Sequence, residues 1–108
     1  MGIIDKGIYI LQIEDECIGF LNMDFIKNFN LKPNEVEFVK NLIPLQIDKG
    51  IDDWMILRLD DIAEQFNIPK PTVSRYMQKL KQTNILVQED FRSPLWKFNP
   101  NIVHYEIR

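Results

Sequence analysis

The residues best suited to chemistry lie in the segment PKPTVSRYMQKL and just after it. At about 100° per residue, Val73, Met77 and Leu80 fall on one side of a helix and predict its buried stripe. The opposite side carries hydrogen-bond donors, acceptors and two cations. Its residues are Pro71, Arg75, Gln78 and Gln82, flanked by Thr72, Ser74 and Lys79. A helix face of this kind fits the major groove of duplex DNA, where the base edges display a readable pattern of donors and acceptors.

Arg75 is the first candidate for reading a base, because a guanidinium can bond guanine through two hydrogen bonds. Gln78 could read adenine in a similar way. We expect short polar or cationic side chains to contact the phosphate backbone instead. These are Lys70, Thr72, Ser74, Lys79 and Lys81. The alternative is that this helix face is only a solvated surface, and the neighbouring segments help to decide between the two.

A second, shorter helix is predicted directly before this one. Asp60 and Asp61 suit its first turn, where the helix dipole favours negative charge, and an apolar pattern continues to Phe66. Asn67 tolerates a left-handed conformation and Pro69 prevents simple helical continuation, so the chain must turn within about three residues. Two helices joined by so short a turn predict a helix-turn-helix and favour DNA contact over a merely solvated surface.

Strand signals surround this pair of helices. Residues 54–58 read as a short strand, and residues 85–98 read as a β-hairpin in the position of a wing, with FRSP as its turn. Asn84 could form a left-handed cap before the hairpin. Arg92 at the tip could reach the DNA backbone or minor groove. We expect Trp96 and Phe98 to seal the core rather than to stack on bases, because duplex bases are already stacked.

The first half of the chain predicts a helix and a second hairpin. Pro33 suits the first position of a helix that ends or kinks near Pro44, with Gly50 closing whatever continues. Segments 8–13 and 17–21 alternate as strands of a hairpin, and one or two helical turns could follow over 23–29. Either both hairpin faces meet protein, which would make the hairpin a dimer contact, or one face is simply exposed.

These elements predict an α+β fold: a winged helix-turn-helix over residues 31–108, with an added N-terminal β-hairpin over residues 1–30. A chain of 108 residues is long enough for one core but not for two, so we expect one compact unit.

Several function classes fit the composition poorly. Cys17 and His104 are the only cysteine and histidine, so a structural zinc site lacks its usual ligands, and we expect no metal or cofactor. The chain has no glycine-rich phosphate loop and no nucleophile elbow, and its acidic clusters read as solvated charge, so we expect a non-enzyme. Without a membrane-spanning stretch or signal peptide, we expect a cytoplasmic protein with no membrane partner.

Net charge is unevenly distributed along the chain. The total of −3 argues mildly against nucleic acid, because Lys and Arg supply most non-specific affinity for phosphates. Residues 1–53 carry −5, however, whereas residues 54–108 carry +2. A locally basic surface on an acidic protein is compatible with selective DNA binding.

Three segments together resemble a known family. They are FLNMDFI, DDIAEQFNIPKPTVSRYMQKLKQTNIL and LWKFNPNIV. Through them the span from Phe20 to Tyr105 is similar to the replication initiators of the RepL type from plasmids of low-GC Gram-positive bacteria, which are winged helices. The middle segment is also typical of winged helices in general, including MarR-like regulators. The RepL resemblance implies recognition of a replication origin and help in loading host replication proteins, with no chemistry of its own.

The sequence therefore predicts a sequence-specific double-stranded DNA-binding protein of a plasmid, phage or other mobile element. It would act in replication initiation or in transcriptional regulation, with host replication or transcription proteins as further partners. One helix-turn-helix reads only a half-site, so we expect a homodimer. The alternative is a winged-helix module that binds protein rather than DNA.

Overall fold

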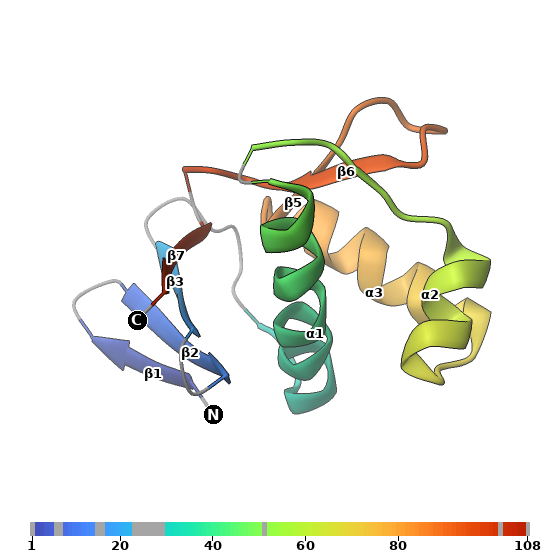
Figure 1. Cartoon of the computed structure of the whole chain (residues 1–108). Helices are drawn as coiled ribbons and strands as arrows, with labels where there is room; N and C mark the ends of the chain where they lie inside the picture. The colour runs from blue at the N-terminus through green and yellow to red at the C-terminus, as the bar shows by residue number, and fades with distance from the viewer. Residues whose placement is uncertain are drawn as a thin grey trace.

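The computed structural model of the chain describes residues 2–5, 8–14, 17–22, 30–50, 52–101 and 103–107. The elements in chain order are β1 (Gly2–Asp5), β2 (Ile8–Glu14), β3 (Cys17–Asn22), α1 (Pro33–Lys49), β4 (Met55–Ile56), α2 (Leu59–Phe66), α3 (Lys70–Gln82), β5 (Leu86–Gln88), β6 (Leu95–Phe98) and β7 (Val103–Ile107). One antiparallel sheet has the order β1-β2-β3-β7 and the other β4-β6-β5. The helix α1 lies between the four-stranded sheet and the pair α2 and α3 (Figure 1).

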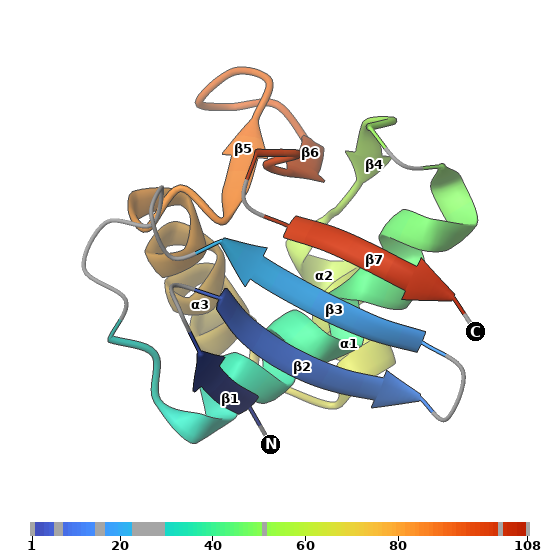
Figure 2. The same ribbon diagram turned by 90° about the vertical axis from the view of Figure 1, so that its left-hand side faces the viewer.

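The three helices and the small sheet β4-β6-β5 form a winged helix-turn-helix, which confirms the predicted α+β fold class. The N-terminal hairpin is also present as β2 and β3. Two further strands, β1 and β7, flank this hairpin and were not predicted. Because β7 pairs with β3, the last strand of the chain lies in the same sheet as the first three (Figure 2). The helical turns expected over 23–29 lie outside the described residues.

The helix α1 begins as its sequence predicts and ends later than Pro44. Pro33 occupies the first helical position, and the Glu35 carboxylate accepts the Lys32 backbone N–H at 2.7 Å, which satisfies one donor at the helix start. Pro44 lies inside the helix, which continues to Lys49, and the left-handed Gly50 (φ 123°) closes it. The sequence predicted that the helix ends or kinks near Pro44, and the prediction of an end there is wrong.

Beyond Pro44, the side chain of Gln46 connects the last turn of α1 to the following loop and to β6. This residue is 1% exposed, and its Nε2 donates to the Gly50 and Asp53 carbonyl oxygens at 2.8 Å each. Its Oε1 accepts the Phe98 backbone N–H of β6 at 3.0 Å. The last turn of α1 thus provides polar partners for the loop that follows it and for the buried strand β6.

A single apolar core joins the helices to the small sheet. Phe38 of α1 lies between Phe66 of α2 and Tyr76 of α3, with ring centroids 5.7 and 5.1 Å away. Trp96 and Phe98 are 4% and 3% exposed, which confirms that they seal the core. The other buried apolar residues are Val39, Leu42, Ile43, Met55, Leu57, Ile62, Val73, Met77, Leu80, Ile85 and Leu86.

Two asparagines make the turns on either side of α3. Asn67 adopts the left-handed conformation (φ 54°) and ends α2, and α3 begins three residues later at Lys70. The Ile68 N–H donates to the Ala63 carbonyl at 3.0 Å, so the turn stays close to α2. Asn84 is also left-handed (φ 69°) and redirects the chain into β5. The predicted short turn and the predicted cap are both confirmed.

Candidate nucleic-acid interface

The helix α3 separates its residues into a buried and an exposed side, as its sequence predicts. Val73 is fully buried, and Met77 and Leu80 are each 1% exposed. The residues of the opposite face lie at the surface: Pro71, Arg75, Gln78 and Gln82 are exposed, whereas Thr72, Ser74 and Lys79 are half-buried. The geometric condition for α3 to enter a DNA groove is therefore met.

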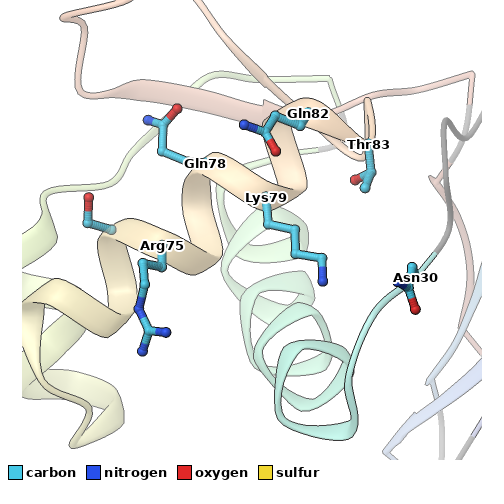
Figure 3. A pocket seen from close by; sticks show the side chains of 7 residues that line it. Asn30, Arg75, Gln78, Lys79, Gln82 and Thr83 are labelled. Carbon is cyan, nitrogen blue, oxygen red and sulfur yellow. The ribbon is translucent and has the colours of Figure 1, made fainter.

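Arg75 projects from the middle of this face. Its side chain is seen extending away from the helix in Figure 3. Its Nη2 donates to Thr72 Oγ1, one turn earlier on the same helix, at 3.3 Å. A hydrogen bond of this length between exposed groups is weak, because water competes for both partners. The guanidinium can therefore leave Thr72 and bond a base edge at little cost.

A shallow hollow of about 460 Å³ runs beside the second half of α3. Its lining is Asn30, Ser74, Arg75, Gln78, Lys79, Gln82 and Thr83 (Figure 3). The hollow is open and lined by amides, hydroxyls and two cations. It is suited to polar or anionic groups of a large ligand lying across α3.

Lys79 is engaged with α1. Its Nζ lies 2.9 Å from Glu35 Oε1, and the two side chains are 30% and 11% exposed. Burial would raise the pKa of Glu35, but the hydrogen bonds from the Lys32 amide and from Lys79, with the positive charges of both lysines, outweigh it and lower the pKa. Because both side chains are partly enclosed, removing one partner leaves the other without its opposite charge in a place that water reaches poorly. Lys79 thus has a structural role that sequence reasoning missed.

Lys70 also has an ion-pair partner, but in a different setting. Its Nζ lies 2.9 Å from Asp60 Oδ1 of α2, with side chains 55% and 79% exposed. Exposed pairs contribute between about 0 and 1 kcal/mol. Lys70 can therefore exchange Asp60 for another anion at little cost.

The turn of the wing is ordered by its own polar groups. Ser93 Oγ donates to Glu89 Oε2 at 3.0 Å, and Asp90 Oδ1 accepts the Phe91 backbone N–H. Both carboxylates near the tip therefore have local partners. Arg92 is exposed, and its guanidinium carbon lies 5.0 Å from the centroid of the Phe91 ring, itself 70% exposed. The tip thus presents a cation supported by an aromatic ring.

Lys81 is placed at the base of the wing. Its Nζ donates to Gln88 Oε1 at 3.0 Å, and Gln88 Nε2 donates to the Ser93 carbonyl at 2.8 Å. These bonds connect the end of α3 through β5 to the wing turn. They fix the wing relative to α3.

A second hollow, of about 410 Å³, lies between α3 and the wing. Three of its lining residues are cations from three separate elements: Arg58 before α2, Lys70 at the start of α3, and Arg92 at the wing tip. Sequence reasoning did not select Arg58, because nothing in residues 54–58 indicates that the wing turn lies over this position. The only available signal was an exposed cation between an apolar strand and a helix start.

Among the residues with described positions, no three histidine, cysteine, aspartate or glutamate side chains gather closely enough to hold a metal ion. None of the helices described here has the length and apolar character needed to cross a bilayer.

Comparison with known protein families finds a match over part of the chain. Residues 55–90 match the model of the IclR helix-turn-helix domain. The matched range runs from β4 past β5 and includes the whole of α2 and α3. The match supports a helix-turn-helix DNA-binding domain of a regulator. It does not confirm the predicted resemblance to RepL-type or MarR-like proteins. The search of curated proteins and the search of solved structures give no match.

Proposed function

We propose that this chain is a sequence-specific double-stranded DNA-binding protein that places α3 in the major groove. One observation carries the proposal: α3 buries its apolar stripe completely and turns a row of donors and acceptors outward, within the range that matches a DNA-binding domain. A protein of this kind acts by occupying a site on DNA, and the proposal assigns it no catalysis.

Within α3 we assign base reading to Arg75 and Gln78, whose side chains are exposed in the middle of the helix. We assign the residues around them to contacts with the DNA phosphate backbone, which position the protein on the duplex. These are Lys70, Pro71, Thr72, Ser74 and Gln82.

A phosphate strand would lie in the hollow between α3 and the wing. Arg58, Lys70 and Arg92 line this hollow together with one carboxylate, Asp60, which is the exposed partner of Lys70. Phosphate contacts fix the register of a protein on the duplex without reading sequence. We therefore add Arg58 to the proposed interface.

We further propose that two copies act together on a roughly palindromic site, because one helix-turn-helix reads only a half-site. The four-stranded sheet offers a surface for pairing. One of its faces lies toward α1, and among the described elements none covers the other face (Figure 2).

The register indicates which positions lie on the uncovered face. Ile3, Ile10, Phe20 and His104 are aligned across the four strands, and residues aligned in this way share a face. His104 is exposed, whereas Gly19, the neighbour of Phe20 in the alternation, is buried. Three of these four positions, Ile3, Ile10 and Phe20, are apolar in the sequence, and apolar residues gathered on an open sheet face favour a protein contact. We assign this face to the second copy.

For the biological process we place transcriptional regulation first, because the matched domain is of a regulator type. Replication initiation on a plasmid or phage is the second candidate, favoured by the RepL-like WKFNPN turn after the wing. In both cases the protein would work on cytoplasmic DNA beside host transcription or replication proteins. Selection of bound sequences from random duplexes, mapped onto the parent replicon, separates the two: promoter sites indicate regulation and origin sites indicate initiation.

DNA binding itself is tested by titrating labelled duplex at several salt concentrations. The proposal predicts an affinity that falls steeply with salt, with a log–log slope of about −0.9 for each phosphate neutralised. An absent or flat response would instead favour a module that binds protein.

A further inference from the structure

Two lysines of α3 form ion pairs of the same length in different surroundings. Lys70 Nζ lies 2.9 Å from Asp60, and Lys79 Nζ lies 2.9 Å from Glu35. The first pair is largely in water, with side chains 55% and 79% exposed, and the second is mostly enclosed, at 30% and 11%. Because the two pairs have the same N–O distance but different burial, we expect a competing anion such as a DNA phosphate to displace the carboxylate partner of one lysine more easily than that of the other.

The surroundings of Glu35 hold Lys79 in place. Glu35 Oε1 accepts the Lys32 backbone N–H at 2.7 Å and the Lys79 ammonium at 2.9 Å. If Lys79 moved to a phosphate, a nearly buried carboxylate would keep only one hydrogen bond, from an uncharged amide. A DNA phosphate that Lys79 does not reach, by contrast, stays solvated by water and is not left as an enclosed, unpaired charge. The exchange is therefore unfavourable for Lys79.

No such cost applies to Lys70. Asp60 is exposed, so water replaces the ammonium when Lys70 leaves. Lys70 also lines the hollow between α3 and the wing, where the phosphate strand is proposed to lie.

We propose that Glu35 is a positioning residue that keeps Lys79 on the protein in the DNA complex. Lys79 then fixes α3 to the start of α1 and neutralises no phosphate, whereas Lys70 exchanges Asp60 for one. The side chain of Lys79 runs from α3 toward the start of α1, as this role requires (Figure 3). The inference rests on the proposed function only for its DNA readout.

The test compares Lys79→Ala with Lys70→Ala in the full chain, using the salt slope of duplex binding. Lys70→Ala is expected to make the slope shallower by about 0.9, the contribution of one phosphate. Lys79→Ala is expected to leave the slope unchanged, even if affinity for all sequences falls. A slope made shallower by about 0.9 in Lys79→Ala overturns the inference.

Thermal unfolding gives a second readout that does not need DNA. Lys79→Ala should lower the Tm more than Lys70→Ala does. The double variant Glu35→Gln/Lys79→Ala should lower the Tm by less than the sum of the decreases in the two single variants, because each single variant removes the same interaction. Strict additivity contradicts the inference. Should Lys79→Ala fail to fold, Lys79→Gln serves instead, because it keeps most of the side chain without the charge, and it should likewise leave the slope unchanged.

The wild-type titration separates this inference from the proposed function. A wild-type protein without salt-dependent duplex binding contradicts the proposed function itself. If wild-type binding depends steeply on salt and Lys79→Ala makes that dependence shallower, DNA binding stands and only the assignment of Glu35 as a positioning residue is contradicted.

Discussion

The two faces of α3 differ in what determines their residues. The inner face is 0 to 1% exposed at Val73, Met77 and Leu80, so the core sets the shape and polarity of each side chain. The outer face at Arg75 and Gln78 makes no contribution to the core. Substitutions on the inner face should therefore change stability, and those on the outer face should change binding. The predictions below test this separation.

The largest expected effect is at Leu80. Leu80→Ala removes buried methyl groups and leaves a cavity, so it should lower the free energy of unfolding by about 2 to 5 kcal/mol in chemical denaturation. Gln82→Ala, on the exposed face two residues later, is the matched control and should stay within about 0.5 kcal/mol of wild type. Similar losses in the two variants would break the comparison.

Arg75→Ala should have the next largest effect, on binding alone. Loss of a bidentate contact with guanine predicts a weakening of about 1 to 3 kcal/mol and a relaxed preference at one position of the half-site, with unchanged unfolding. Arg75→Lys sharpens the test, because it keeps the charge but not the planar pair of donors. It should retain the salt slope and lose the preference. If Arg75→Ala alters neither affinity nor preference, another face of the protein reads the DNA.

Arg58→Ala and Arg92→Ala should act more weakly and without sequence preference. Each is expected to weaken binding to all duplexes alike and to make the salt slope shallower by about 0.9. Selection experiments on both variants should return the wild-type consensus. A changed consensus in Arg92→Ala would instead give the wing a role in reading bases.

The smallest expected effect concerns stability in acid. The pKa of Glu35 is lowered from its ordinary value near 4.5, so its stabilising effect is present above that value and is lost as the pH falls through the lower, folded-state pKa. Glu35→Gln should therefore reduce the acid dependence of unfolding in this range. Unfolding curves at a series of pH values for wild type and variant check this, and identical pH dependence would contradict it.

The parts of the fold that the sequence predicted depend on local signals. Pro33, Asn67 and Asn84 act within their own turn, and the stripe at Val73, Met77 and Leu80 follows from helical spacing alone. The buried and the exposed side chains of α3 were therefore predicted correctly.

The parts that sequence reasoning missed depend on contacts between distant segments. The ion pair of Glu35 with Lys79 spans 44 residues, and the hydrogen bond from the Phe98 amide to Gln46 spans 52. The pairing of β7 with β3 joins the two ends of the chain. Arg58 enters the proposed interface only because the wing folds back over it. None of these partners can be paired from local spacing, because each side chain alone fits a solvated surface equally well.

The most direct test of the central claim is NMR mapping of ¹⁵N-labelled protein titrated with a selected duplex. The account predicts that the largest shifts fall on the side-chain signals of Arg75 and Gln78 and on the wing around Arg92. Largest shifts on the four-stranded sheet, or around β4 and the end of α1, with α3 unaffected, would contradict it.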